Sequence, residues 1–515
     1  MTKVQQLVPE IEITNPWRDT DPVRVKHLLE HTAGFDDMHF SEFINANDDP
    51  QMPLKQALSI TPASRTVRWK PGTRYSYSNP GYAVAGYIIE KITGQKYERY
   101  LKEEVLQPIG MSNSSFRYTD SVRAQLVTGY RAKYKPQEYM HIYLRPAGYL
   151  HTSADEMGRF VRMMLNDGSL GGHSLIADSL LKRMEIPMTS LAAKRGYKRG
   201  YGLGIKNSMN QGYSYRGHAG GIPGFSAQYM YFPEHNRGFV LLINMMSGFG
   251  EISDAITNYL LRDVPEPDPA PTTDVSAETL SQYQGYYEHR SLRNELFRPL
   301  FVLLNGPTLS VRDDTLRLGG FMKSPEPLLP TSEQRFRRDD ETVASTFFMD
   351  TEEYGQVMLL DGNFYVKTGS WKKYLYRGAF FTGLGLLASL LLFSLFWIPF
   401  ETYRYYRAER SPMAYQRLFW WPFGALLSLG VLIVAGSQLS LLTIGQQTLS
   451  SMLIMVSTYL FGIASAGSLW VAGQSWGQDI HWGIKSYFSL VAIALTGFSL
   501  FLLYWDWMGL RLWAY

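Results

Sequence analysis

The chain has no cysteine among its 515 residues, and its charge is nearly balanced. The lack of cysteine excludes disulfides, thiolate zinc sites and a cysteine nucleophile, and it suits an exposed bacterial envelope protein. The formal net charge is +4 at pH 7 and basic residues form no continuous stripe, so we expect no nucleic-acid partner. The opening residues also lack the apolar stretch of a signal peptide.

Long apolar runs occur only toward the end of the chain. Each is long enough to cross a bilayer at about 1.5 Å per residue, and tryptophans at the run ends are typical of an interfacial belt. The runs lie near residues 378–400, 419–444, 452–472 and 486–504. They predict a four-helix transmembrane region over residues 376–515, a multi-pass integral membrane protein, and the membrane as a partner.

Basic residues near the first run give its orientation. The loop after the run carries Arg404, Arg407, Arg410 and Arg417. Because positive loops favour the cytoplasmic side, this loop predicts that the first half of the chain lies outside the cytoplasm, in the bacterial cell envelope. The opposite flank of the run is also basic and argues the other way, with Lys372, Lys373 and Arg377.

The tripeptide Tyr77-Ser78-Asn79 lies between two clear local signals. Lys70-Pro71-Gly72-Thr73 predicts a turn before it. Apolar residues at helical spacing predict a helix after it, ending at Gly94: Ala85, Ile88, Ile89 and Ile92. A tight loop leading into a buried helix holds a phenol and an amide in fixed directions, as proton transfer and substrate positioning require. Taken alone, a loop tyrosine is more often simply packed.

His27-Leu28-Leu29-Glu30-His31 matches the H-x-x-E-H pattern of the inverted zinc peptidases. On a helix, two imidazoles four residues apart share one face. A zinc site would also need a third ligand and a longer helix, whereas Ala33-Gly34 ends this one. A zinc peptidase on His27 and His31 is therefore the weaker alternative, and we expect no metal.

Short motifs follow one another through the first half of the chain. They are His27-Leu28-Leu29, His31-Thr32-Ala33-Gly34, Pro71-Gly72, Tyr77-Ser78-Asn79-Pro80-Gly81-Tyr82, Pro108-Ile109-Gly110-Met111, the segment 146–153, Tyr201-Gly202-Leu203-Gly204 and the segment 217–225. In this order they resemble the β-lactamase-related serine hydrolases, which include class C β-lactamases, D-Ala-D-Ala carboxypeptidases, D-aminopeptidases and certain esterases. The resemblance ends near Leu261. It implies an α/β (α+β) domain over residues 1–262, with an antiparallel sheet flanked by helices.

Local patterns agree with such a domain. Ser153-Ala154-Asp155-Glu156 reads as a capping box before an apolar helical stripe. Residues 225–232 alternate like a strand, and residues 238–244 read as its buried partner. The glycines before them would let a substrate backbone approach closely.

The resemblance also implies roles for individual residues. Tyr77 would act as base or acid, and Asn79 would orient the substrate. His218 would replace the basic residue of the family's Lys-Thr-Gly segment, although a turn histidine is the ordinary interpretation of such a residue. Gly220 and Gly221 would border the substrate, and the Gly221 amide would be an oxyanion donor. No cofactor is implied. The partner is a small-molecule or peptide substrate with an amide or ester bond, such as a peptidoglycan-like peptide, a β-lactam or an ester.

One part of the family pattern is missing. The family's nucleophile is a serine followed three residues later by lysine, upstream of the His-Leu-Leu segment, yet no serine precedes His27. Two later matches, Ser179 with Lys182 and Ser370 with Lys373, read as coincidence. We expect either an N-terminally shortened exported enzyme, which we favour, or a degenerate relative. The chain as printed is expected to be inactive as a hydrolase. The alternative function is a catalytically dead, membrane-anchored binding or sensor protein.

Between these two parts the composition changes. Residues 263–275 are rich in proline and predict an extended linker. Short strand patterns separated by turn signals over residues 276–375 predict a small β domain. We interpret this domain as a spacer without chemistry.

Overall fold

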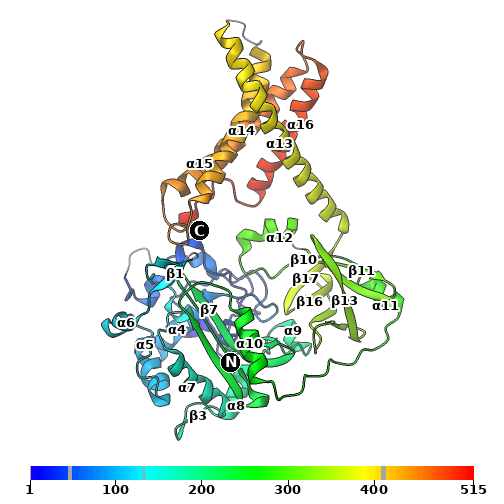
Figure 1. Ribbon diagram of the computed structural model, residues 1–515. Helices are drawn as coiled ribbons and strands as arrows, with labels where there is room; N and C mark the ends of the chain where they lie inside the picture. The colour runs from blue at the N-terminus through cyan, green and yellow to red at the C-terminus, as the bar shows by residue number, and fades with distance from the viewer. Residues whose placement is uncertain (1, 45–48, 132–133, 305, 408–412) are drawn as a thin grey trace. The chain divides into compact units, whose positions relative to one another are not determined.

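The computed structural model describes residues 2–44, 49–131, 134–304, 306–407 and 413–515. Contacts divide the chain into two units, Met1–Thr368 and Gly369–Tyr515. Figure 1 shows helices and strands of both units.

The helix predicted after Tyr77 is α4 (Asn79–Thr93). It begins at an N-cap, where the Ser78 hydroxyl oxygen accepts from the Gly81 N–H, and it ends at Gly94, whose φ of 70° is left-handed. This prediction is confirmed. Val84 and Ile88 pack into the largest core cluster of the unit, together with Leu28 and Leu54. The other helices up to the sheet are α1 (Val4–Leu7), α2 (Val25–Leu29), α3 (Leu54–Leu58), α5 (Tyr97–Leu101), α6 (Asp120–Gln125), α7 (Ala154–Leu165), α8 (Asp178–Glu185) and α9 (Leu191–Lys194).

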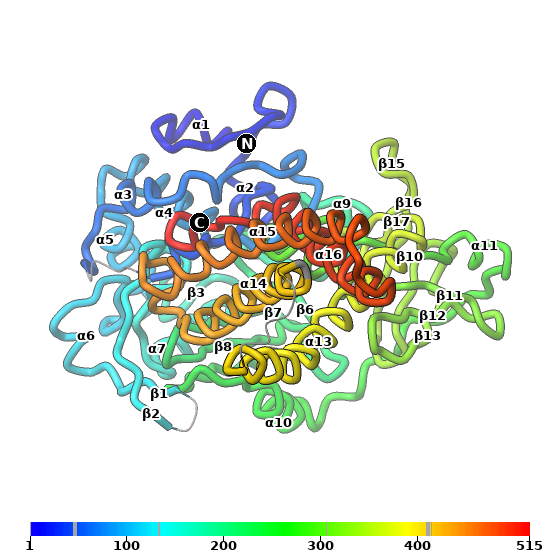
Figure 2. Tube along the Cα trace, turned by 90° about the horizontal axis from the view of Figure 1, so that it is seen from above, coloured from blue at the N-terminus to red at the C-terminus, as the bar shows by residue number. Residues whose placement is uncertain are grey.

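A five-stranded antiparallel sheet follows, in the order β5-β6-β7-β8-β9. Its strands are β5 (Gly200–Tyr201), β6 (Lys206–Asn210), β7 (Tyr213–Ile222), β8 (Phe225–Phe232) and β9 (Arg237–Ile243), so the predicted strand pair is confirmed. Tyr231 packs with Val161 of α7, whereas Phe232 packs with Leu261 at the end of α10 (Gly250–Leu260). Helices α7 and α10 thus lie on opposite faces of the sheet (Figures 1 and 2).

The pairing of β7 changes along its length. On one side, β6 pairs with it only from Tyr213 to Gly217. On the other side, β8 pairs with it from Arg216 to Ile222. Among the described residues, the edge of β7 from His218 to Ile222 therefore has no strand partner on the β6 side.

The predicted small β domain is a closed barrel of eight antiparallel strands, in the order β10 to β17. Buried aromatic and aliphatic side chains fill its interior, among them Tyr287, Phe336 and Phe348. Two short helices accompany it, α11 (Ala277–Gln282) and α12 (Arg298–Leu304). The strands are β10 (Gly285–His289), β11 (Thr308–Arg312), β12 (Thr315–Gly320), β13 (Lys323–Ser332), β14 (Arg335–Arg338), β15 (Thr346–Thr351), β16 (Gly355–Leu360) and β17 (Asn363–Thr368).

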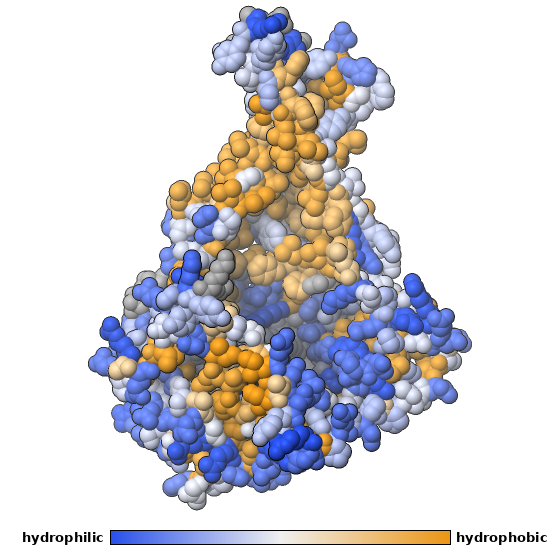
Figure 3. Space-filling model, viewed as in Figure 1, coloured by the Kyte–Doolittle hydropathy of each residue, from blue (hydrophilic) through white to orange (hydrophobic). Residues whose placement is uncertain are grey.

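Among its described residues, the second unit contains four helices that are long and apolar enough to cross a membrane, as predicted. They are α13 (Ser370–Tyr406), α14 (Met413–Ser437), α15 (Leu449–Ser475) and α16 (Trp482–Tyr504). Apolar residues cover much of their surface (Figure 3). The second helix ends at Ser437, short of the predicted boundary near Ile444, and residues 441–445 form turns instead of helix. Arg410, one of the four arginines on which the predicted orientation depends, lies outside the described residues.

Candidate functional site

The loop that carries Tyr77 is tied by its backbone to the segment after α2. The Gly72 N–H donates to the Thr32 carbonyl (2.8 Å) and the Ser76 N–H donates to the His31 carbonyl (2.9 Å). Gly72 has a φ of 78°, and a Cβ there would lie 2.9 Å from Nε2 of His27. Glycine is therefore needed both for the turn and for the close approach. These bonds fix the position of Tyr77.

His31 lies beneath Tyr77 in a group of aromatic rings. Its ring stacks on that of Tyr77 at a centroid distance of 4.1 Å, and Tyr201 meets it edge-on at 4.7 Å. The Ser78 N–H donates to its Nδ1 at 3.0 Å, so in the neutral ring the proton is on Nε2. Burial lowers the pKa of His31 well below its usual value, which keeps the ring neutral.

The zinc alternative is not supported by this geometry. Helix α2 ends at Leu29, and His31 follows with a left-handed φ of 52°, so His27 and His31 do not share a helical face. Nδ1 of His27 accepts from the Arg24 N–H (3.3 Å). In the part of the chain that the structure describes, no group of three or more His, Cys, Asp or Glu could hold a metal. One helix therefore does not present both imidazoles, and the absence of a metal stays an expectation.

Tyr77 and His218 come together although they are distant in sequence. Their ring centroids are 6.3 Å apart, and Tyr201 lies 5.7 Å from the first and 5.5 Å from the second. Burial raises the pKa of Tyr77 and lowers the pKa of His218. Both side chains are consequently neutral near pH 7. The role of Tyr77 as base or acid stays a prediction.

Asn79 is held by a buried carboxylate. Its backbone N–H and its side-chain Nδ2 both donate to Oδ1 of Asp37, each at 2.9 Å. The other oxygen of Asp37 accepts from Nε of Arg293 at 2.5 Å. Asn79 is therefore one member of a chain of polar contacts, and substrate orientation by Asn79 stays a prediction.

Arg293, like Asp37, is a residue of this site that the sequence did not reveal. It follows β10, yet its guanidinium carbon lies 4.5 Å from the centroid of the Tyr77 ring. Charge from Arg293 opposes the rise in the pKa of Tyr77 caused by burial. The β domain therefore contributes a side chain to the surroundings of Tyr77, and its interpretation as a spacer without chemistry stays a prediction. No motif marks this arginine, because its partner Asp37 is far away in sequence.

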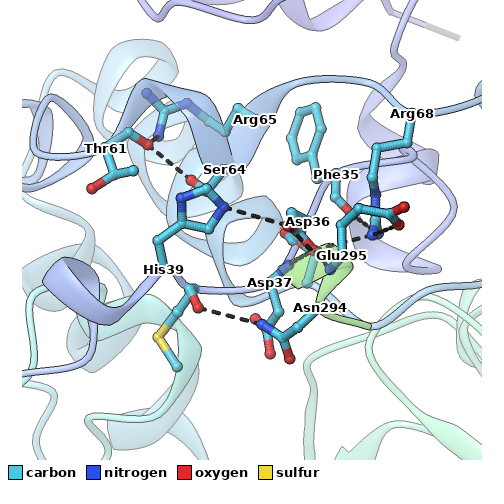
Figure 4. A network of polar contacts seen from close by, with 12 residues as sticks. Phe35, Asp36, Asp37, His39, Thr61, Ser64, Arg65, Arg68, Asn294 and Glu295 are labelled. Atoms are coloured by element: carbon cyan, nitrogen blue, oxygen red, sulfur yellow. Dashed lines mark hydrogen bonds and ion pairs between the residues drawn. The ribbon is translucent and has the colours of Figure 1, made fainter. Parts of the chain in front are cut away.

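A second network fixes the segment around Arg293 (Figure 4). Nη1 of Arg68 pairs with Oδ1 of Asp36 (3.1 Å) and also donates to the Leu292 carbonyl (2.9 Å). The Glu295 N–H donates to Oδ1 of Asp36 (3.1 Å). Asp36 is buried, and breaking a buried ion pair is strongly destabilising. The barrel segment is thus fastened to the residues just before the Tyr77 loop.

The order of the motifs, the antiparallel sheet and the paired Tyr77 and His218 rings agree with one family. A family model described as Beta-lactamase matches residues 2–262. The chain belongs to the Beta-lactamase family. The resemblance inferred from the motifs is confirmed.

Individual relatives are distant from this Beta-lactamase-family chain. A Homo sapiens protein named beta-lactamase-like 1 is 26% identical over 234 residues, which cover 43% of this chain and 44% of that protein. Protein flp of Staphylococcus aureus strain COL is 22% identical over 236 residues, which cover 44% of each. The octameric penicillin-binding protein homologue from Pyrococcus abyssi is 20% identical, with a TM-score of 0.41, over 71% of this chain and 82% of that chain. The chain thus spans about 44% of the length of the curated relatives it matches.

The two Ser-x-x-Lys matches do not resemble the family's nucleophile. Ser179 and Lys182 lie in the short helix α8, where the Lys182 amine pairs with Asp178 at 2.7 Å and is largely exposed. Ser370 and Lys373 begin α13, in the second unit. The contacts of Lys182 favour the interpretation of this match as coincidence.

Glycines line the open edge of β7 beside His218. A Cβ on Gly220 would meet nothing within 4 Å, and one on Gly221 would come no closer than 3.9 Å to another atom. Both residues are exposed. Packing of the protein therefore does not require glycine here, whereas the approach of another backbone would.

Proposed function

We propose that the first unit binds an amide or ester substrate along the open edge of β7, with the substrate carbonyl between Tyr77, His218 and the Gly221 amide. The observation that carries this proposal is the meeting of the Tyr77 and His218 rings, 6.3 Å apart, beside a strand edge where Gly220 and Gly221 carry no side chain. The substrate is a small molecule or peptide, such as a peptidoglycan-like peptide, a β-lactam or an ester. The apolar helices anchor this activity at the cell envelope, with the first unit outside the cytoplasm.

The expected mechanism follows from the protonation states. The substrate backbone pairs with β7, and the Gly221 N–H donates to the carbonyl oxygen where negative charge develops. In a turnover, a nucleophile would add to the carbonyl carbon as the bond to the leaving group breaks, and Tyr77, kept neutral by burial, would donate its proton to that leaving group. Neutral His218 offers a hydrogen bond where the family's lysine would offer a charge. Arg293, above the Tyr77 ring, stabilises the phenolate that forms when the proton leaves.

Acylation would need an activated serine, because the covalent intermediate divides a difficult step into two easier ones. The printed chain has no serine before His27. In this chain we expect reversible binding without a stable acyl-enzyme. This property also suits the second candidate function, a membrane-anchored binding or sensor protein.

A fluorescent penicillin tests the proposal on the full 515-residue chain in detergent micelles. We expect reversible binding by fluorescence anisotropy and no labelled band after denaturation. Gly221→Ala, whose Cβ meets no close atom of the protein, should weaken binding while leaving the thermal unfolding midpoint unchanged. Exposed Lys198→Met serves as the control. A band that survives denaturation and maps to Ser179 would overturn the proposal, as would equal binding by Gly221→Ala.

A further inference from the structure

A cavity of about 220 Å³ lies in the first unit between three segments that are distant in sequence. Its lining comes from α2 and the residues just before it, from the turn at Pro71-Gly72, and from residues between Met188 and Lys194. Among the residues that the structure describes, neither the five-stranded sheet nor Tyr77 contributes to the lining. Pockets for drug-sized ligands typically hold roughly 300–1,000 Å³, so this cavity suits a single small group.

Positive charge dominates the wall of this cavity. Arg24, Lys26 and Lys194 line it, against the single carboxylate of Asp21. Lys26 is half-buried, and its amine forms no ion pair and donates no hydrogen bond to any residue that the structure describes. Partial burial and then the charge of Lys26 lower the pKa of Lys194. The two amines therefore lie close enough to share one anion.

His27 presents a hydrogen-bond donor to the same cavity. The residue is 7% exposed, and its Nδ1 accepts from the Arg24 N–H (3.3 Å), so the neutral ring carries its proton on Nε2. Burial, followed by the charges of Lys26 and Arg24, lowers the pKa of His27 to about 4, which keeps the ring neutral at pH 7. Within the described part of the chain, Nε2 has no hydrogen-bond acceptor. An acceptor placed in the cavity would satisfy this donor.

Gly72 keeps the way to this donor open. A Cβ at Gly72 would lie 2.9 Å from Nε2 of His27, so a side chain here would cover the donor. Nζ of Lys194 donates to the Gly72 carbonyl (3.0 Å), which holds the amine at the wall and leaves two of its three protons for another acceptor. The Gly72 N–H donates to the Thr32 carbonyl (2.8 Å). The cavity thus borders the turn that fixes the position of Tyr77.

Nearby carboxylates do not remove the excess of positive charge. Glu30, whose charge also reaches Lys194, already accepts from Arg183 (2.5 Å) and from the Thr189 hydroxyl (2.7 Å). Asp21 forms no ion pair with any described residue. The lining therefore carries three positive charges and one negative charge, which leaves an excess of two.

We propose that this cavity binds the dianionic phosphate group of a phosphate monoester, with the amines of Lys26 and Lys194 and the Nε2–H of His27 as its donors. Such a group carries about −1.5 to −2 charges at pH 7 and three strong acceptor oxygens, which match the charge excess and the three donors. A carboxylate offers one charge and two oxygens. The group can belong to a soluble phosphorylated compound or to a lipid headgroup. The proposal does not depend on the proposed function.

Lysine acetylation measures occupancy of the cavity. The full chain in detergent is treated with trace acetic anhydride at constant ionic strength, and the rates at Lys26 and Lys194 are measured by peptide mass mapping. Ethyl phosphate should slow both rates by roughly fivefold or more, whereas acetate at the same concentration should slow them little. Exposed Lys198 is the internal control and should not change. Equal protection by acetate, or equal protection of Lys198, would overturn the phosphate assignment.

Nanodiscs distinguish the two sources of the phosphate group. The full chain is placed in phosphatidylcholine discs with or without phosphatidic acid, whose headgroup is a phosphate monoester. Protection of Lys26 and Lys194 by phosphatidic acid assigns the site to a lipid headgroup. Protection by dissolved ethyl phosphate but not by phosphatidic acid assigns it to a soluble compound. If neither probe protects the two lysines, the site is overturned.

Substitutions test which residues hold the group. In Lys26→Met, the concentration of the protecting probe, ethyl phosphate or phosphatidic acid, that half-protects Lys194 should rise about tenfold, because one charge-assisted hydrogen bond is lost. Lys194→Met should have the same effect on protection of Lys26. Lys26→Arg should retain most of the affinity, and Lys198→Met should not change it.

Equal thermal unfolding midpoints of the unmodified chain and the four variants show that folding is intact. Unchanged protection in both lysine-to-methionine variants of the cavity would show that the anion binds elsewhere and would overturn the proposal. A loss in Lys198→Met as large as that in Lys26→Met would indicate a general effect of charge and would overturn it as well.

Discussion

Strand β7 contains two halves that use glycine for opposite reasons. In the half paired on both sides, a Cβ at Gly217 would lie 2.1 Å from the Tyr229 carbonyl oxygen. In the half with an open edge, a Cβ at Gly220 would meet nothing. One glycine is required by the protein's own backbone, and the other leaves space for something that is not part of the chain. The same residue type thus marks packing in one half and access in the other.

A methyl group added in each half of β7 should affect stability very differently. Gly217→Ala should reduce the free energy of unfolding by about 2–3 kcal/mol, because a backbone carbonyl in a sheet cannot move aside cheaply. Gly220→Ala should change it by less than about 0.5 kcal/mol. Thermal unfolding of the full chain in detergent measures both. Equal losses in the two variants would show that the open half is as closely packed as the paired half.

A smaller effect on stability is expected from two histidines, His218 in the open half of β7 and His31, which stacks on Tyr77. His31 is buried and its pKa in the folded chain lies well below 6.5. Below pH 6.5 this histidine is therefore protonated in the unfolded chain while it is still neutral in the folded chain. The stabilisation that comes from neutral His31 should therefore be fully present above pH 6.5. Below that pH the free energy of unfolding should fall by about 1.4 kcal/mol per pH unit for one such group. His31→Gln should flatten this slope more than His218→Gln does. Chemical denaturation between pH 5 and pH 8 provides the measurement.

Arg293 offers a test of how the barrel supports the open half. Removing its guanidinium in Arg293→Met leaves Asp37 buried with only the donors of Asn79. Since Arg293 is itself 56% exposed, the loss should be only about 1 kcal/mol. The pKa of Tyr77 should rise further, because the cation that opposes the effect of burial is gone. Exposed Arg312→Met is the control, and an unchanged tyrosine titration would contradict the role of Arg293.

Substitution of Gly221 should have the smallest effect on stability and a clear effect on ligand binding. Gly221→Ala should leave the unfolding midpoint within about 1 °C of the unmodified chain, as a surface substitution does. It should weaken penicillin binding about tenfold, because the methyl group occupies the line of the ligand backbone. If binding is unchanged while stability falls, the open edge belongs to the protein's packing.

Local signals in the sequence were sufficient for much of this fold. Apolar spacing and Gly94 predicted α4, alternation predicted β8 and β9, and run length predicted the four membrane-type helices. These features depend on residues close together in the chain, where periodicity and capping act directly. The meeting of Tyr77 with His218 came from the order of family motifs, which encodes a known tertiary arrangement.

Long-range contacts could not be predicted in this way. The left-handed residue His31 ends α2 because its backbone bonds to the Tyr77 loop, and no local pattern shows that bond. Arg293, shortly after β10, bonds to Asp37, which is more than 250 residues earlier in the chain. The cavity of about 330 Å³ that Lys206 and Gly362 line has the same origin, since its wall joins β6 to the turn between β16 and β17. Each of these depends on two segments that meet only in the folded unit.

The open edge of β7 has a consequence for solubility. An unpaired strand edge exposes backbone groups to which a second chain can add, and such addition starts edge-to-edge aggregation. The barrel avoids this hazard because its strands close on themselves. In β7 the exposed stretch is short and contains Gly220 and Gly221, with Pro223 directly after the strand. Residues with poor strand propensity make it a weak template for a neighbouring copy, while a small ligand held by side chains on both sides can still lie along it.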